Sequence, residues 1–172
     1  ALHGNERERN SKQAFLSLKK SSEEGRSEAS YLLGLLYENG DGFERNLEEA
    51  MKYYQRASEQ GDSNGFNRIG FCYDNQKEYP KAIENYEKAT KMGNLFALNN
   101  PGFMYSNGKG VDQDYLKAIE YFHKAADLGL PIAMNNLAFI YERGKGVDQD
   151  YSKAIELYEK AISFEVPDAM NN

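Results

Sequence analysis

Among the side chains that could act as a nucleophile or a general base, the sequence has two histidines, His3 and His123, and one cysteine, Cys72. A Cys–His pair would support nucleophilic catalysis, and a cluster of His, Cys and Asp would support metal binding. No such cluster has the spacing of metal ligands, and His3 falls in a predicted loop. His123 falls in a polar column of a predicted helix, and Cys72 in an apolar column, where a thiol behaves as a small hydrophobe. We therefore expect no enzyme activity, no metal and no other cofactor.

Two Gly-x-Gly segments could be mistaken for a phosphate-binding loop. They are Gly108-Lys109-Gly110 and Gly144-Lys145-Gly146. A phosphate loop needs a following Lys-Ser/Thr and joins a strand to a helix, whereas these segments join two predicted helices. They are typical of turns that need a positive φ.

The chemistry that remains is protein recognition, carried by side chains that recur at a fixed interval. Phe supplies contact area that loses water on binding, and an Asn amide can pair with both backbone groups of a bound chain. Carboxylates favour basic partner residues. The candidate partner-binding residues form an apolar column of Leu35, Phe71, Phe103 and Phe139, a column of Tyr31, Asn67, Asn99 and Asn135, and an acidic column of Glu38, Asp74 and Glu142, with Ser106 in its third place.

A 36-residue period sets the positions of these columns. The heptapeptide KGVDQDY occurs at 109–115 and again at 145–151. Within each unit, Ala, an aromatic residue four places on and Ala seven places on mark one face of an amphipathic helix. A period of this length is typical of a solenoid, in which each unit buries its apolar face against its neighbours. The sequence therefore predicts an all-α solenoid of antiparallel helix pairs, each with a helix A, a loop and a helix B.

Small residues and caps at fixed places support this pattern. Gly on helix A and Ala on helix B let the two backbones approach while Tyr or Phe fills the space above them. Left-handed C-terminal caps are expected after helix B, and side-chain N-caps before it. The predicted C-caps are Gly25, Gly61, Gly93 and Gly129, and the predicted N-caps are Asn46, Asp114 and Asp150. Pro131 is expected to open a helix A.

The register divides residues 1–172 into one solenoid domain. It has a partial unit 1–26, units 27–62, 63–94, 95–130 and 131–166, and a partial unit 167–172. The first partial unit is expected to hold only a helix B, at 10–24. We interpret the chain as a piece cut from a longer array, or as an array without caps.

Two places depart from the period. Unit 63–94 is shorter, because residues 75–78 replace the longer Gly-x-Gly-Val loop, and it is closer to a plain tetratricopeptide repeat. It is expected to change the local superhelical pitch. Pro101 stands inside a helix A, where proline removes a backbone hydrogen bond and is expected to kink the helix at a cost of roughly 3 kcal/mol.

Residues 133–161 carry the pattern A-x-x-N-L-G-x-x-Y-x-x-G-x-G-V-x-x-D-Y-x-K-A-x-x-x-Y-x-K-A, with Ala138 in place of the first Gly. This pattern resembles the Sel-one-like repeat (SLR), a branch of the tetratricopeptide-like repeats. The resemblance implies a right-handed superhelix of helical hairpins and a scaffold or adaptor role. It also implies that the three columns line the concave surface. SLR proteins that have been discussed as hydrolases carry paired Cys in every repeat, unlike this chain with one Cys.

Composition excludes several partners. The net charge is -6 and no basic block occurs, so nucleic acid and an anionic membrane surface are not expected partners. The longest apolar run, 31–37, is too short to span a bilayer. We expect a cytoplasmic location and no direct membrane insertion.

Two functions stay open. The first is a non-catalytic adaptor that binds a peptide or protein partner on the concave face of the helices A. The alternative is a structural or regulatory arm of a larger protein, which packs on its own neighbouring domain or self-associates, so a homo-oligomer is possible. Neighbouring helices A touch in a tight superhelix, so the Phe column either contacts a partner or is partly core.

Overall fold

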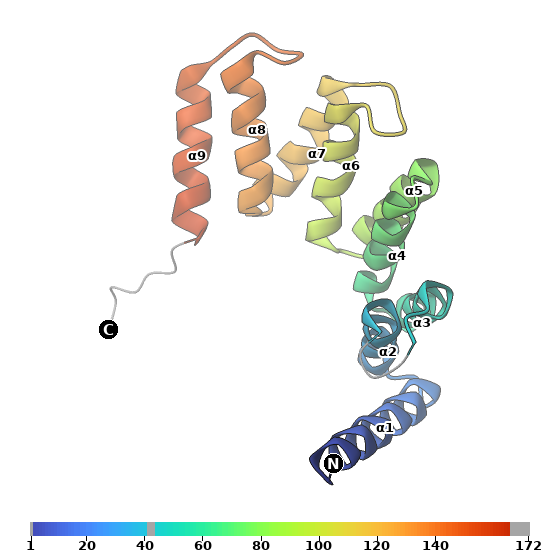
Figure 1. The fold of residues 1–172 in the computed structure, drawn as a ribbon. Coiled ribbons are helices and arrows are strands. Elements are labelled where there is room, and N and C mark those ends of the chain that lie inside the picture. Colours follow the sequence, from blue (N-terminus) through green and yellow to red (C-terminus); the bar gives the residue numbers. More distant parts are fainter. Residues whose placement is uncertain (1, 41–43, 166–172) are drawn as a thin grey trace, which may run out of the picture.

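Nine helices follow one another in the computed structural model, which describes residues 2–40 and 44–165 (Figure 1). They are α1 (Leu2–Glu23), α2 (Ser27–Asn39), α3 (Leu47–Glu59), α4 (Ser63–Asn75), α5 (Tyr79–Lys91), α6 (Leu95–Asn107), α7 (Tyr115–Asp127), α8 (Pro131–Arg143) and α9 (Tyr151–Glu165). These ranges contain no strand. The predicted all-α solenoid is confirmed, with α2, α4, α6 and α8 as the helices A.

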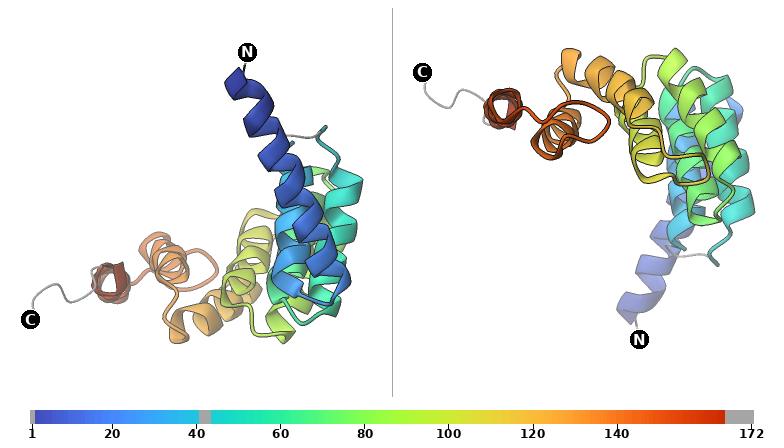
Figure 2. Two further views of the ribbon diagram at one scale, coloured as in Figure 1. Left: turned by 90° about the horizontal axis from the view of Figure 1, so that it is seen from below. Right: turned by 90° about the horizontal axis from the view of Figure 1, so that it is seen from above.

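The helices form a curved stack in which each helix packs on its neighbours in sequence. Figure 1 shows α2 and α4 on the inner side of the curve and α3 and α5 on its outer side. The two further views show that successive pairs also rotate, so that α8 and α9 lie far from α2 and α3 (Figure 2). In the part of the stack that holds α2 and α4, the helices A of two consecutive units lie side by side on the inner side of the curve.

Glycine and an aromatic ring share the contact between the two helices of a pair, as the sequence predicted. A Cβ atom on Gly70 would lie 2.7 Å from the ring of Tyr86, and one on Gly102 would lie 2.7 Å from the ring of Phe122. A Cβ on Gly34 would clash with Tyr54, whose side chain is fully buried. In these three pairs the absence of a side chain lets the rings pack at this depth, whereas the α8–α9 pair has Ala138 at the same position.

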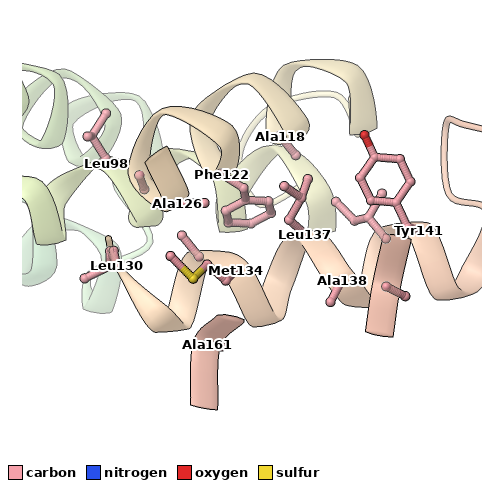
Figure 3. Packing of buried hydrophobic residues seen from close by; sticks show 14 residues of the cluster. Leu98, Ala118, Phe122, Ala126, Leu130, Met134, Leu137, Ala138, Tyr141 and Ala161 are labelled. Atoms are coloured by element: carbon pink, nitrogen blue, oxygen red, sulfur yellow. The ribbon is translucent and has the colours of Figure 1, made fainter. Parts of the chain in front are cut away.

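The largest core cluster joins one helix pair to the next. Phe122 of α7 points toward Met134 and Leu137 of α8, and all three side chains are fully buried (Figure 3). Ala161 of α9 belongs to the same cluster. The apolar face of α8 is therefore covered from both sides, as a solenoid requires.

The predicted caps are in place. The side chains of Asn46, Asp114 and Asp150 accept hydrogen bonds from backbone N–H groups three residues on, at 2.9–3.0 Å. The φ angles of Gly25, Gly61, Gly93 and Gly129 lie between 84° and 97°. Pro131 opens α8.

The first helix is longer than predicted. The repeat register placed a loop before residue 10, but α1 begins at Leu2 and includes His3. Glu and Arg, which are frequent in this segment, have high helix propensity, and no Gly-x-Gly turn interrupts it. The predicted partial unit 167–172 lies outside the described residues.

Helix α6 is not interrupted at Pro101. The ring is fully buried in the column that holds Leu33, Ile69 and Leu137 in the other helices A.

In the short unit, Lys77 takes a φ of 62° between α4 and α5, the left-handed conformation that Gly108 and Gly144 adopt in the longer loops.

Candidate functional site

The three phenylalanines of the apolar column are exposed. Phe71, Phe103 and Phe139 have 43%, 50% and 43% of their surface accessible, on α4, α6 and α8. Leu35 of α2 differs, because it is half-buried against the core cluster around Tyr54. The column therefore offers three large apolar side chains to solvent at consecutive helices A.

A hollow of about 180 Å³ lies between α6 and α8. Phe103 and Phe139 line it together with Lys145. The Nζ atom of Lys145 lies 4.8 Å from the centre of the Phe139 ring, and the Arg143 guanidinium lies 5.6 Å from it. These are cation–π distances, so two phenylalanine rings and the cationic Lys145 meet at this hollow.

The second predicted column takes part in contacts between consecutive helices A. Asn100 Nδ2 donates to Asn67 Oδ1 at 3.1 Å, and Asn136 Nδ2 donates to Asn99 Oδ1 at 2.8 Å. Arg68 Nε donates in the same way to the hydroxyl of Tyr31, at 3.3 Å. We call these three contacts the inter-helix ladder.

The ladder uses the acceptor atoms of the column, and it leaves Asn99 only 9% exposed. Asn67 and Asn135 are half-buried. The ladder links α2 to α4, α4 to α6 and α6 to α8. This part of the predicted site therefore also fixes the distance between the helices that carry the phenylalanines.

The acidic column is paired within the chain. The Tyr54 hydroxyl donates to Glu38, and the Tyr158 hydroxyl donates to Glu142 Oε2 at 3.1 Å. In the third helix pair, Phe122 has no hydroxyl and the column holds Ser106. Burial first, and the neighbouring carboxylate second, raise the pKa of both tyrosines above its ordinary value.

Cationic side chains add to this pairing. Lys109 Nζ lies 2.7 Å and 2.9 Å from the two carboxylate oxygens of Asp74, an ion pair that joins the α6–α7 loop to α4. Arg68 lies 3.9 Å from Glu38. A preference of this column for basic partner residues stays a prediction.

Of the candidate catalytic side chains, the structure describes Cys72 on α4 and His123 on α7, which have different neighbours. Cys72 is a free thiol with 1% of its surface exposed, and burial raises its pKa to about 11. His123 Nε2 lies 3.5 Å from the Tyr141 hydroxyl. Among the described residues, no group of three or more His, Cys, Asp or Glu side chains is placed to hold a metal ion.

Two further hollows were missed in the sequence. One, of about 430 Å³, lies where helices B turn into helices A and is lined by the exposed side chains of Phe96 and Leu128. The other, of about 590 Å³, lies between α3 and α4. The place of each hollow depends on how side chains of different helices and turns meet. The repeat pattern does not show these contacts.

This architecture defines a tetratricopeptide-like helical-repeat protein, a class whose repeats generally mediate protein–protein interaction. The Sel1 repeat model matches residues 27–62, 96–130 and 131–163, which together are more than half of the chain. The Tetratricopeptide repeat model matches residues 63–92, as expected for the short unit. The chain belongs to the Sel1 repeat family.

Solved structures agree. The chain is 32% identical to a protective antigen of uropathogenic Escherichia coli that displays an SLR fold, with a TM-score of 0.79 over 88% of this chain and 33% of that one. A Sel1 repeat protein from Oxalobacter formigenes is 29% identical, with a TM-score of 0.79 over 88% and 64%. Cysteine rich protein B of Helicobacter pylori is 28% identical, with a TM-score of 0.57 over 73% and 92%.

The chain thus spans about a third of the length of the Escherichia coli antigen and less than two thirds of the Oxalobacter formigenes protein. No curated protein matches it. Within the described ranges, no helix combines the length and apolar character needed to cross a bilayer.

Proposed function

We propose that this chain is an adaptor that binds a peptide or protein partner on the face of α4, α6 and α8 that carries Phe71, Phe103 and Phe139. The observation that supports it most is the exposure of these three side chains, each at 43–50%, at the same position of consecutive helices. A repeated aromatic residue on an outward face contributes little to the core, whereas it supplies contact area to a ligand.

The hollow between α6 and α8 supplies an anchor point. Phe103 and Phe139 form its walls, so an apolar side chain of the ligand would lose water on both sides there. Lys145 of the lining and the neighbouring Arg143 both lie over the Phe139 ring. They could also receive a carboxylate of the ligand. We therefore propose an extended ligand that carries an apolar anchor residue close to an acidic group.

The inter-helix ladder supports the same proposal. Its Asn–Asn contacts hold α4, α6 and α8 at a regular distance, so the phenylalanines are presented as a fixed row. A pre-ordered surface loses less conformational entropy on binding than a mobile one. A partner would then meet three aromatic anchors whose spacing is already set.

A peptide selection tests this function. Peptides would be selected from a random display library on the purified chain, and the affinity of the best binder would be measured by fluorescence anisotropy. We expect the triple variant Phe71→Ser, Phe103→Ser, Phe139→Ser to bind at least about tenfold more weakly, because anchors of this kind each contribute about 1–2 kcal/mol or more.

The matched control removes three apolar side chains from helices B instead: Leu116→Ser, Ile155→Ser and Ile162→Ser, at residues 57–61% exposed. Its affinity should equal that of the unmodified chain. Circular dichroism should show that both triple variants stay helical. If the phenylalanine variant is folded and binds the peptide as well as the unmodified chain does, the proposed binding face is wrong.

The alternative is a structural or regulatory arm of a larger protein. It is favoured by the coverage of the similar structures, since this chain corresponds to 33% of the Escherichia coli antigen. Self-association measured by analytical ultracentrifugation, with the apolar row as the contact, would support this second proposal over the first.

A further inference from the structure

The groove between α3 and α4 shares no lining residue with the phenylalanine row of the proposed ligand face. Its volume is about 590 Å³. It is lined by Glu48, Met51, Lys52 and Gln55 of α3, and by Ile69, Tyr73 and Gln76 on or next to α4. Glu48 and Lys52 form an ion pair of 3.0 Å, so its rim carries paired rather than single charges.

The equivalent groove between α5 and α6 is filled by a tyrosine. The ring of Tyr121 of α7 stacks on Tyr105, with centroids 5.9 Å apart and planes at 11°. Its hydroxyl donates to Glu87 of α5 at 2.8 Å. A helix B thus places one aromatic side chain over the junction of the two preceding helices.

The same repeat position carries a large side chain in two other helices B. Tyr53 of α3 stacks on Tyr37 with centroids 5.6 Å apart and planes at 11°. Leu157 of α9 packs against the largest core cluster. In α5, however, the position holds Asn85, whose Nδ2 donates to the Lys81 carbonyl oxygen of its own helix at 2.8 Å. Asn85 is 8% exposed and does not line the groove, so the ring that Tyr121 supplies in the next unit has no counterpart here.

The two groups that hold the Tyr121 ring have counterparts in the open groove. Tyr73 stands at the repeat position of Tyr105, and Gln55 at that of Glu87, and both line the groove. Gln55 Nε2 already donates to Glu59 Oε1 at 3.0 Å, so its carbonyl oxygen is the atom suited to accept a phenol hydroxyl. Met51 and Ile69 supply apolar walls.

We propose that this groove binds a tyrosine side chain of a partner protein. The ring of the bound tyrosine stacks on Tyr73, and its hydroxyl donates to the side-chain oxygen of Gln55, as Tyr121 does at Tyr105 and Glu87. A neutral phenol fits a rim whose charges are paired. The site is separate from the phenylalanine row, so this proposal does not depend on the proposed adaptor face and is tested separately.

The test is an NMR titration of the whole chain with N-acetyl-L-tyrosinamide and, separately, N-acetyl-L-phenylalaninamide. We expect saturable amide shifts at the groove-lining residues of α3 and α4. The tyrosine derivative should bind about threefold or more tightly than the phenylalanine derivative, because only it can make the hydrogen bond to Gln55. No saturable shift at the groove, or equal affinities, would overturn the proposal.

Two variants sharpen the test. Asn85→Tyr should fill the groove from within the chain, raise Tm and weaken binding of the tyrosine derivative at least about tenfold. Glu156→Tyr, at an exposed position of α9, is the control and should change neither. Gln55→Leu should keep the fold and remove the preference for tyrosine over phenylalanine.

Unchanged binding in a folded Asn85→Tyr variant would contradict the assignment. A concentration-dependent dimer of the unmodified chain that the same variant abolishes would show that the tyrosine comes from a second copy, and the proposal of a different partner would be wrong.

Discussion

Glycine–aromatic pairs are the residues on which the packing within each helix pair depends. The alignment of Gly34, Gly70 and Gly102 with Tyr54, Tyr86 and Phe122 was predictable, because both members recur at fixed spacing. The inter-helix ladder was not, because hydrogen-bond partners on different helices depend on the rotation between units. The sequence showed an Asn column, but only the structure shows that Asn67 and Asn99 accept bonds from the next helix.

Replacing Gly34 with Leu is expected to destabilise the chain. The new side chain would enter the space of the buried Tyr54 ring, and such overpacking costs about 1–3 kcal/mol. Thermal unfolding followed by circular dichroism measures the effect. Ser152→Leu, at an exposed position of α9, is the control and should leave Tm nearly unchanged. If the Gly34→Leu variant has the same Tm as the unmodified chain, the assigned contact between Gly34 and Tyr54 is wrong.

The buried thiol of Cys72 predicts a pH dependence. Burial raises its pKa to about 11 in the folded chain, above the value of about 8.5 for an exposed thiol. Between these values the unfolded chain releases a proton that the folded chain keeps. The free energy of unfolding therefore falls as the pH rises from about 9 to about 11, and the contribution is fully present below that range.

Urea unfolding at pH 8 and at pH 10.5 checks this prediction. The unmodified chain should lose more stability between the two pH values than a Cys72→Ala variant. The buried Tyr54 and Tyr86, whose pKa values are also raised, remain in both proteins, so the difference between the two losses comes from the thiol and its electrostatic coupling to these tyrosines. Equal losses in the two proteins would contradict the assigned burial of the thiol.

At the scale of the helices, the sequence predicted the helix ends best. Caps act locally, so Asn46, Asp114 and Asp150 were identifiable from the residues around them. The predicted start of the first helix was wrong, because the repeat register was extended into a segment that does not follow the repeat. In the short unit, the sequence showed the missing loop but not that Lys77 would adopt a positive φ.

Removing one cap should weaken one helix pair. Asp114→Ala deletes the hydrogen bond from the Lys117 N–H, 2.9 Å long, and should cost about 1 kcal/mol. Asp112→Ala removes a carboxylate of the same loop that does not cap α7, so its Tm should stay within about a degree or two of the unmodified chain. If the two variants lose the same stability, the effect is one of charge and not of capping.

The described part of the molecule is a row of helix pairs in which α4, α6 and α8 expose a phenylalanine at the same repeat position. Whether Phe71, Phe103 and Phe139 would be exposed could not be predicted, because it depends on how closely consecutive helices A approach. The structure leaves them 43–50% exposed with a hollow between two of them. The groove between α3 and α4 was not predicted either, because its walls come from two helices whose relative placement the repeat pattern does not give.

The most direct test of the binding face is an amide chemical-shift map of the chain with the best selected peptide. The account predicts that the shifts concentrate on α4, α6 and α8, around Phe71, Phe103 and Phe139, and vanish in the triple serine variant. Shifts confined to α3, α5 and α7 would contradict it, because the ligand would then lie on the helices B.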